Sequence, residues 1–283
     1  MKKVVIILVI YNENLYESKT YISLLQSISK YNFYKNLFHL IIYDNSLTKQ
    51  NYIVNSDLIS NQYIHNPSNG GLAVAYNFAF AYAQEFNYSW ILLLDQDTIL
   101  QEIFFHNLIT DLNKLHNTND YVAIVPIAYS NNKTLSPYII KFGNRYSTID
   151  STNYNINNDL NIYAVNSGSL IRTNFLKEIG GFDEIFWLDF LDHWLFHQIY
   201  LKSKKVYISK NIIEHNLSIS SYKDFSLKRF KNILYAESIF ITRYSNLINK
   251  LLYKVILIFR SLKFLFYHHR YDFSLIIIKN IFK

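Results

Sequence analysis

Two carboxylates stand two residues apart directly after a short apolar run. Residues 90–94 are followed by Asp95, Gln96 and Asp97. Carboxylate oxygens are hard ligands, and at this spacing the two acids can share one Mg²⁺ or Mn²⁺. A divalent ion there would neutralise a diphosphate and stabilise it as a leaving group. The competing interpretation is structural, because Asp97 or Thr98 could cap a helix that begins near Ile99.

Polar residues also follow three other apolar runs. In an open parallel sheet, ligands bind beyond the carboxyl ends of the strands, so residues directly after a strand are candidates for a site. One polar strand end is commonplace, but four at the same edge indicate a binding site. The other three ends are Tyr11, Asn12 and Glu13, then Asp44, Asn45 and Ser46, and then Asn66, Pro67, Ser68 and Asn69.

Two further features are ambiguous on their own. Asn69, Gly70 and Gly71 open a predicted helix, and the N–H groups at a helix start can bind an anion. In isolation, an ordinary turn that needs glycine explains these three residues better. His215 follows the strand-like residues 211–214, and a lone histidine is more often structural than a metal ligand.

A second polar region surrounds two acids near residue 190. Asp189 and Asp192 are three residues apart, so on a helix they would share one face. Trp187 and Trp194 stand close by in the sequence, and aromatic rings pack on the apolar faces of pyranose rings. This region could therefore bind a sugar, with ordinary surface acids as the alternative.

Short apolar runs alternate with helix-length segments over the first two-thirds of the chain. This pattern predicts an α/β fold with a mostly parallel sheet covered on both faces. From residue 130 to 161 the Asn/Ser/Tyr-rich sequence predicts a long connection with a short hairpin. The expected strands are 4–10, 40–43, 63–65, 90–94 and 122–125, and the expected helices are 17–31, 70–86 and 99–115.

The composition is that of a globular protein with a large core. Of 283 residues, 50% are hydrophobic, and Gly (6) and Pro (3) are few. The lack of cysteine excludes disulfides, thiolate zinc sites and cysteine nucleophiles. Residues 1–10 indicate an opening strand and not a signal peptide, because no small-residue cleavage site follows. No apolar run approaches the roughly 20 residues of a membrane-spanning helix, so a cytoplasmic protein is expected.

The positive charge is concentrated at the C-terminal end. The net charge is +7, and residues 222–283 hold twelve Lys/Arg against three Asp/Glu, a local charge of +9. Helices that are apolar on one side and basic on the other lie in a bilayer interface and favour anionic lipids. A helical cap on the domain is the alternative, and no nucleic-acid partner is expected. The predicted organisation is a domain over 1–221, with halves 1–125 and 126–221, and a basic, apolar helical tail over 222–283.

In order and spacing, these motifs resemble the family 2 glycosyltransferases, and within them the bacterial rhamnosyltransferase-like group. The resemblance runs from Val4 to about Ser218. The motifs that carry it are Ile10-Tyr11-Asn12, Asp44-Asn45-Ser46, Asn69-Gly70-Gly71-Leu72-Ala73 with Asn77, Asp95-Gln96-Asp97, Ser167-Gly168-Ser169, Gly180-Gly181-Phe182-Asp183-Glu184, Asp189-Phe190-Leu191-Asp192 and Glu214-His215.

The resemblance implies a GT-A fold and an inverting, single-displacement reaction. Asp192 would be the general base that deprotonates the acceptor hydroxyl. Asp97 would bind Mn²⁺ or Mg²⁺ with Asp95, and His215 falls where some members place another metal ligand. Nucleotide-sugar contacts would come from Tyr11, Asn12, Glu13, Asp44, Asn45, Asn69, Gly70, Gly71, Asn77, Asp95 and Gln96. The acceptor side would hold Ser167, Gly168, Trp187, Asp189 and Trp194.

The implied reaction moves a sugar from a nucleotide-diphosphate donor, dTDP-L-rhamnose first and a UDP-hexose next. The acceptor would be a lipid-linked or growing surface glycan, such as O-antigen, capsule or cell-wall polysaccharide, reached from the inner face of the cell membrane. Trp194 and Gln198 depart from the group's usual acid and Arg on the acceptor side. The alternatives are a phosphohydrolase of the haloacid-dehalogenase type and a catalytically inactive binding subunit with the same fold.

Overall fold

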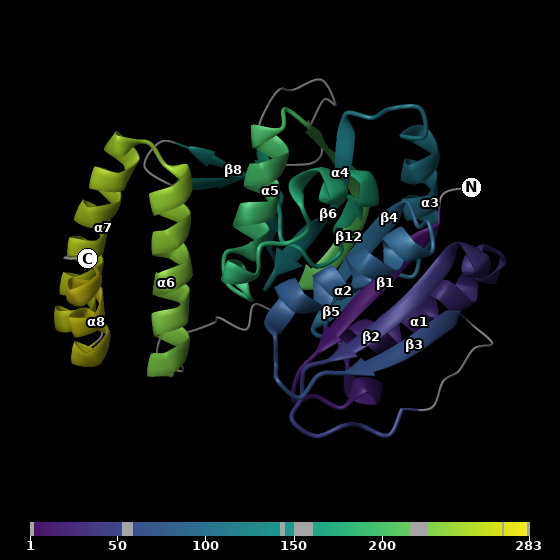
Figure 1. Cartoon of the computed structure of the whole chain (residues 1–283), viewed down its shortest axis with the longest axis horizontal. Helices are drawn as coiled ribbons and strands as arrows, with labels where there is room; N and C mark the ends of the chain where they lie inside the picture. Colours follow the sequence, from purple (N-terminus) through teal and green to yellow (C-terminus); the bar gives the residue numbers. More distant parts are fainter. Residues whose placement is uncertain are drawn as a thin grey trace. The chain divides into compact units, whose positions relative to one another are not determined.

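The chain divides into two compact units (Figure 1). Unit 1 consists of Met1–Lys141 with Tyr146–Asn216, and unit 2 of Phe142–Arg145 with Leu217–Lys283. The computed structural model describes residues 3–52, 59–141, 145–149, 161–215, 226–267 and 269–281.

Unit 1 is built on a mixed sheet in the order β3-β2-β1-β4-β11-β6-β12-β5, with β7 beside β6. The strands from β3 to β4 run parallel, as do β6 and β12, whereas β11 is antiparallel to both of its neighbours. A second sheet has the order β10-β8-β9. The strands are β1 (Val4–Ile10), β2 (Phe38–Asp44), β3 (Ser60–His65), β4 (Trp90–Asp95), β5 (Thr98–Leu100), β6 (Tyr121–Ser130), β7 (Lys133–Ser136), β8 (Tyr138–Lys141), β9 (Arg145–Thr148), β10 (Ile162–Tyr163), β11 (Leu170–Arg172) and β12 (Lys205–His215).

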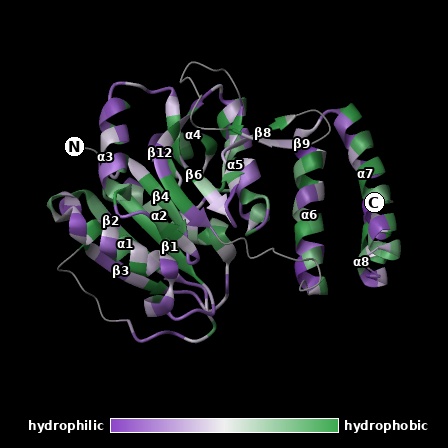
Figure 2. Cartoon of the chain, turned by 180° about the vertical axis from the view of Figure 1, so that it is seen from behind, coloured by the Kyte–Doolittle hydropathy of each residue, from purple (hydrophilic) through white to green (hydrophobic). Residues whose placement is uncertain are grey.

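The central strands are buried because helices cover both faces of the sheet. All seven residues of β1 are buried, and such continuous apolar runs are typical of parallel strands covered on both sides. Hydrophobic residues run along β1 and β4 (Figure 2). Alternate residues of β1, beginning with Val4, share one core cluster with residues of α1 and α3, while α2 packs on β1 and β4. The helices of unit 1 are α1 (Lys19–Lys30), α2 (Gly71–Glu85), α3 (Phe104–Lys114), α4 (Thr173–Ile179) and α5 (Leu191–Leu201), with 3₁₀ turns η1 (Leu15–Glu17), η2 (Asn32–Leu37) and η4 (Glu184–Phe186).

The five expected strands are confirmed, but the expected helix over 99–115 begins too early. Thr98–Leu100 is instead strand β5, and α3 starts only at Phe104. The reason is tertiary, because β5 pairs with the end of β12, more than a hundred residues later in the chain. The interpretation of Asp97 or Thr98 as a cap of a helix from Ile99 is therefore wrong. The expected connection after residue 130 contains β7, β8 and β9, and residues 150–160 lie outside the described part.

The described part of unit 2 contains three helices, α6 (Leu227–Tyr244), α7 (Leu247–Phe266) and α8 (Tyr271–Ile281). Phe230 of α6 stacks on Phe273 of α8 with ring centroids 4.0 Å apart. Arg260 of α7 donates two hydrogen bonds, of 2.6 and 2.9 Å, to the carboxylate of Glu237 on α6. Within the described ranges, no helix is both long enough and apolar enough to cross a membrane.

Candidate active site

The carboxyl ends of β1 and β2 are tied together by backbone and side-chain hydrogen bonds. The Asn45 amide donates to the Ile10 carbonyl at 2.9 Å. The carboxylate of Asp44 is fully buried and accepts hydrogen bonds from the Ser46 amide at 2.8 Å and from the Tyr63 hydroxyl at 2.5 Å. Asp44 therefore shapes the loop after β2, and its predicted contact with a nucleotide stays a prediction.

A cavity of about 680 Å³ opens beside these strand ends. Its volume lies within the range of small-molecule binding sites. Asn12 and Glu13 line it, as predicted for a binding site at this edge, and Gln50 braces its wall by donating to the Glu13 carbonyl at 2.8 Å. The sequence analysis did not predict the lining residues between 47 and 51. Their position directly after a strand end could have indicated them. The full lining is Asn12, Glu13, Asn14, Ser46, Leu47, Thr48, Gln50 and Asn51.

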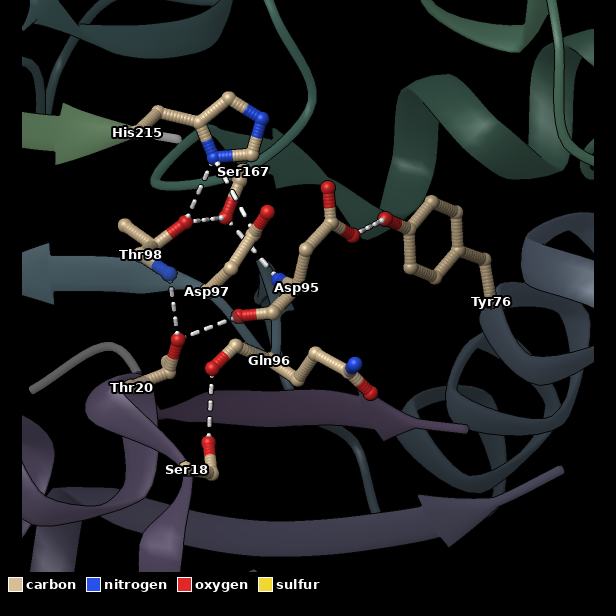
Figure 3. Close-up of polar contacts among 9 residues, drawn as sticks. All are labelled: Ser18, Thr20, Tyr76, Asp95, Gln96, Asp97, Thr98, Ser167 and His215. Carbon is tan, nitrogen blue, oxygen red and sulfur yellow. Dashed lines mark hydrogen bonds and ion pairs between the residues drawn. The ribbon is translucent and has the colours of Figure 1, made fainter. Parts of the chain in front are cut away.

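Gln96 joins the first strand end to the fourth. Its side-chain oxygen accepts a hydrogen bond of 2.6 Å from the Tyr11 amide. Its carbonyl oxygen accepts one of 2.8 Å from the hydroxyl of Ser18 (Figure 3). The structure thus brings together Tyr11, which is half exposed, and the residue between the two acids.

The two acids of the Asp95-Gln96-Asp97 turn point to different partners (Figure 3). Tyr76 of α2 donates to Asp95 Oδ1 at 3.1 Å, whereas Asp97 Oδ1 lies 3.4 Å from His215 Nδ1. Burial raises the pKa of Asp95 and of Asp97 above the usual values, and the charge of His215 opposes this shift in both. Burial, and next the charge of Asp97, also raise the pKa of Glu13. Three carboxyl groups therefore crowd one edge of the sheet.

A polar chain beneath the acids fixes the position of His215. His215 is the last residue of β12 and pairs with Thr98 of β5. The Thr98 hydroxyl lies 3.0 Å from His215 Nδ1 and 2.6 Å from Ser167 Oγ. Ser167 in turn accepts a hydrogen bond of 2.9 Å from the Asp95 amide. His215 is thereby held beside Asp97, and metal binding by the two residues stays a prediction.

The Asp97–His215 pair fits a divalent cation that the substrate helps to bind. A carboxylate oxygen is a suitable ligand for Mn²⁺ or Mg²⁺, whereas an imidazole nitrogen suits a transition metal better than the hard Mg²⁺, so the pair favours Mn²⁺. The Asp97 side chain is 31% exposed, so a substrate can reach it. In the described part of the chain, no three His, Cys, Asp or Glu side chains are arranged to hold a metal by themselves. Substrate oxygens and water would therefore complete the coordination.

Asp192 lies in the first turn of α5 and faces the same region. Burial is the main cause of the raised pKa of Asp95 and of Tyr76, and the negative charge of Asp192 adds a smaller effect in both, so the three groups lie in the same region. Burial raises the pKa of Asp192, but the charge of His193 and its hydrogen bonds outweigh this effect and hold the pKa below its ordinary value. Asp192 is therefore ionised at neutral pH, the state that a general base requires.

The start of α2 is closed by protein and does not resemble the predicted anion site. The amides of Leu72 and Ala73 donate to the Trp187 carbonyl at 2.7 and 3.3 Å. Gly71 has φ +78°, and a Cβ there would collide with the carbonyl and the ring of Trp187. The glycine is needed for this close approach. The suggestion that the first-turn N–H groups bind an anion is therefore wrong for these two amides, and contacts of Asn69 and Gly70 with nucleotide stay predictions.

Several residues assigned to the acceptor side are part of the packed interior. Trp194 is only 4% exposed and packs on Phe182, so it offers no face to a sugar. Ser167 is fully buried below Asp95. Asp189 precedes α5, which begins at Leu191, so it does not share a helix face with Asp192. The expectation that Asp189 and Asp192 share a helix face is therefore wrong, and so is the sugar-packing role of Trp194. Acceptor-side roles of Ser167 and Asp189 stay predictions.

Two other predicted site residues have clear structural contacts. Asn77 of α2 donates to the Phe182 carbonyl at 2.9 Å and accepts from the Phe182 amide at 2.8 Å, which fixes the segment before α5. Gly168 has φ +81°, and a Cβ there would press against Pro126 and Ile213. Roles in substrate binding stay predictions for both residues and for Trp187.

Solved structures of S. aureus TarS have a similar fold. S. aureus TarS matches with a TM-score of 0.53 and 16% identity, over 93% of this chain and 44% of that chain. TarS 1-349 in complex with UDP-GlcNAc matches with a TM-score of 0.54 and 15% identity, over 93% and 73% of the two chains. Its complex with UDP gives 0.51 and 16%, over 94% and 73%. This chain thus spans less than half of the longer TarS chain. The structural similarity shows the fold and confirms the expected GT-A architecture.

The sequence itself decides the family. No curated protein matches the chain at a significant level of sequence similarity. The model of glycosyl transferase family 2 matches residues 5–180, a span that includes every strand end described above except that of β12. Because the match covers more than half of the chain, the protein belongs to glycosyl transferase family 2.

Proposed function

We propose that this protein transfers a sugar from a nucleotide-diphosphate donor to a hydroxyl group of a glycan or lipid-linked acceptor. The observation that carries the proposal is the Asp97–His215 pair, 3.4 Å apart, at the same sheet edge as a cavity of about 680 Å³. Membership of glycosyl transferase family 2 supports this chemistry. It also removes the phosphohydrolase alternative, which needs a different arrangement of residues around its Asp-x-Asp strand.

The donor's nucleotide occupies the cavity beside Asn12 and Glu13 in this proposal. Two neighbouring structures are complexes with UDP and with UDP-GlcNAc. A UDP-hexose is therefore the first donor to test, ahead of the dTDP-L-rhamnose suggested by the resemblance. Tyr11 and Asn45, at the ends of the two strands that flank the cavity, remain candidates for contacts with the base and ribose.

The diphosphate of the donor lies at the crowded acids. Mn²⁺ or Mg²⁺ bound by Asp97 and His215 would neutralise the negative charge of the leaving diphosphate. Asp95 lies deeper, where the Tyr76 hydroxyl fixes its carboxylate at 3.1 Å. Its place between Asp97 and Asp192 suits contacts with the donor's sugar. These three acids would then line the path from leaving group to acceptor.

Asp192 acts as the general base in an inverting displacement. The carboxylate accepts the proton of the acceptor hydroxyl while the acceptor oxygen attacks the anomeric carbon. The bond from that carbon to the diphosphate breaks on the opposite face, and the diphosphate leaves with the electron pair. Asp192 suits this role because it is ionised and 28% exposed, so an acceptor can reach it.

Unit 2 supplies the contact with a membrane-held acceptor. α7 has four Lys/Arg and no acidic residue. It also exposes apolar side chains, among them Leu251 (58%), Phe259 (68%) and Phe266 (71%). An apolar surface with cations beside it suits an anionic lipid layer. We place the protein on the inner face of the cell membrane, where precursors of a surface polysaccharide are assembled.

Calorimetric titration with UDP, dTDP and GDP, each with and without Mn²⁺, tests the proposal. We expect one nucleotide to bind in a metal-dependent manner and the binding to be lost in Asp97→Ala. The matched control is Asp120→Ala, which removes an exposed carboxylate outside the site and should bind like the wild type. If no nucleotide binds under any condition, the transferase proposal fails and the inactive-subunit alternative gains support.

A further inference from the structure

We propose that His193 is a positioning residue for the general base, and that it acts as the middle member of a Tyr–His–Asp chain. In this series of hydrogen bonds, the hydroxyls of Tyr138 and Tyr146 fix the His193 ring, and the ring fixes the carboxylate of Asp192. The inference rests on the proposed glycosyl transfer with Asp192 as base. It assigns a role to β8 and β9, a region that the sequence pattern left without one.

The first link joins His193 to Asp192. Asp192 Oδ1 accepts a hydrogen bond of 2.8 Å from the His193 amide and lies 3.0 Å from His193 Nδ1. Both contacts use the same carboxylate oxygen, so they fix the rotation of the carboxylate about its side chain. The proposal assigns the second oxygen, Oδ2, to the acceptor hydroxyl.

The second link joins His193 to two tyrosines. Nε2 lies 3.2 Å from the Tyr146 hydroxyl and 3.4 Å from the Tyr138 hydroxyl. Burial, and next the charge of Asp192, raise the pKa of Tyr138 well above its ordinary value, so its hydroxyl keeps its proton and can donate. A neutral imidazole that accepts at Nε2 must carry its hydrogen on Nδ1. Because the ionised Asp192 carboxylate can only accept, Nδ1 carries the hydrogen, and a tyrosine hydroxyl that donates to Nε2 favours the same tautomer.

Aromatic packing holds the ring in this orientation. The His193 ring lies 4.8 Å from the ring of Phe190 and 5.7 Å, edge to face, from that of Tyr146. Phe190 adopts a left-handed backbone with φ +62° at the start of α5. Such a conformation is costly for a bulky residue, and it turns the chain so that Phe190 covers His193. The side chain of His193 is 16% exposed and that of Asp192 28%.

The transfer of the sugar to the acceptor leaves the hydrogen bonds between the tyrosines, His193 and Asp192 unchanged. The acceptor O–H bond breaks and its proton moves to Asp192 Oδ2. The acceptor oxygen forms the bond to the anomeric carbon, and the diphosphate departs with the electrons of the broken glycosyl–phosphate bond. The Nδ1–H group of His193 keeps its proton and remains bonded to Oδ1, and Oδ2 takes the proton of the acceptor.

The same contacts set the pH at which Asp192 is active. Among the residues that the structure describes, the titratable groups around its carboxylate are His193 on α5, Tyr76 from α2, Asp95 from β4, Tyr138 from β8 and, through His193, Tyr146 from β9. Burial raises the pKa of Asp192, and His193 provides the largest opposing effect. A base with a lowered pKa stays active until the pH falls through that value. Without His193, protonation and loss of activity should therefore begin at higher pH.

Three variants separate a positioning role from simple packing. His193→Phe keeps an aromatic ring but removes both ring nitrogens, whereas His193→Asn keeps a donor near the position of Nδ1. The matched control is His197→Phe, one turn later on α5, where the ring contacts the Tyr163 hydroxyl at 3.2 Å. The assay is release of UDP from UDP-GlcNAc with water as the acceptor, or from the dTDP-sugar if only dTDP binds, measured as kcat and KM from about pH 3 to 9 so that the acid limb of the wild type is included.

We expect His193→Phe to lower kcat by about tenfold or more and to change KM little. The loss would be a part of the rate enhancement of about 10²–10⁴ that a positioned general base supplies. The acid limb of its pH profile should move to higher pH. His193→Asn should recover part of the loss, and His197→Phe should resemble the wild type. If His193→Phe and His197→Phe show the same kcat and pH profile, the proposal is overturned.

A second measurement does not depend on activity or on that variant folding. ¹⁵N NMR of the wild-type chain labelled at histidine reports the tautomer of His193, which we expect to carry its hydrogen on Nδ1. In Tyr146→Phe, which removes only an exposed hydroxyl, the population should shift toward Nε2–H. If the wild-type His193 ring carries its hydrogen on Nε2, the proposed hydrogen bond from His193 to Asp192 is contradicted. If the tautomer is as expected but the wild type turns over no donor, the failure lies in the proposed transferase function and not in this arrangement.

Discussion

At the residue scale, a buried threonine connects the two halves of the candidate metal site. Thr98 is fully buried, and its hydroxyl lies within hydrogen-bonding distance of both Ser167 and His215. Its amide donates to the Thr20 hydroxyl at 2.8 Å. The side chain thus links β5 to β12 and orients the imidazole toward Asp97. Nothing in the sequence pattern marked Thr98 for this role.

Replacing Thr98 with valine should test this connection, because valine keeps the shape and removes the hydroxyl. Ser167 and His215 then each lose a buried hydrogen bond, so we expect the free energy of unfolding to fall by about 1–3 kcal/mol. Mn²⁺-dependent nucleotide binding should weaken as well. Urea denaturation and calorimetry measure the two effects. Thr110→Val, at an exposed position of α3, is the control and should change stability by less than about 0.5 kcal/mol.

At the element scale, the start of α2 positions the segment that leads to the general base. The Trp187 carbonyl accepts hydrogen bonds from two amides of the first turn of α2. Asn77, later on the same helix, holds the backbone of Phe182. α2 therefore fixes residues 182–187, five to ten positions before Asp192. Gly71, which resembles part of a phosphate-binding turn in the sequence, instead allows the backbone of α2 to approach that of Trp187.

Gly71→Ala and Gly180→Ala form a matched pair that separates a clash from backbone strain. Both glycines have left-handed φ, +78° and +80°, but a Cβ at Gly180 meets nothing within 4 Å. Gly180→Ala should therefore cost only the strain, about 1–2 kcal/mol. Gly71→Ala must also displace Trp187, so we expect a larger loss of stability together with a drop in kcat. Thermal unfolding and donor turnover measure both. Equal losses in the two variants would show that the contact with Trp187 is unimportant.

At the scale of the whole molecule, charge and apolar exposure are concentrated in unit 2. Residues 222–283 hold twelve Lys/Arg against three Asp/Glu. Tyr253, Leu257 and Phe264 of α7 are buried within the unit, while apolar residues between them are exposed. Lys254 and Lys263 stand among these exposed positions. The arrangement favours a lipid surface over a second copy of the chain, because two such basic faces would repel each other.

Reversing the charge of Lys254 and Lys263 to glutamate should therefore release the protein from vesicles of phosphatidylserine and phosphatidylcholine. Each lysine near an anionic surface contributes about 1 kcal/mol, so the double variant should bind roughly 30-fold more weakly or worse. Co-sedimentation with the vesicles measures this. Lys133→Glu with Lys177→Glu makes the same charge change at exposed positions of unit 1. If both pairs lose binding equally, net charge and not the α7 face controls the interaction.

The sequence by itself determined the features that depend on local pattern. Continuous apolar runs predicted the buried central strands, and the polar residues after them predicted the edge that carries the candidate site. The strand prediction is confirmed, because hydrophobic burial depends on short segments of the sequence. The site at this edge stays a prediction that rests on strand direction. The order and spacing of the motifs also pointed to glycosyl transferase family 2, which the family match confirms.

Only the tertiary structure decided which residues meet. The pairing of β5 with β12 replaced an expected helix and brought His215 to Asp97 across more than a hundred residues. Packing buried Trp194, and the Trp187 carbonyl closed the start of α2. Hairpin strands from a segment without a clear pattern placed Tyr138 and Tyr146 against His193. Such contacts depend on the closure of long loops and on side-chain burial, and neither is encoded in the spacing of neighbouring residues.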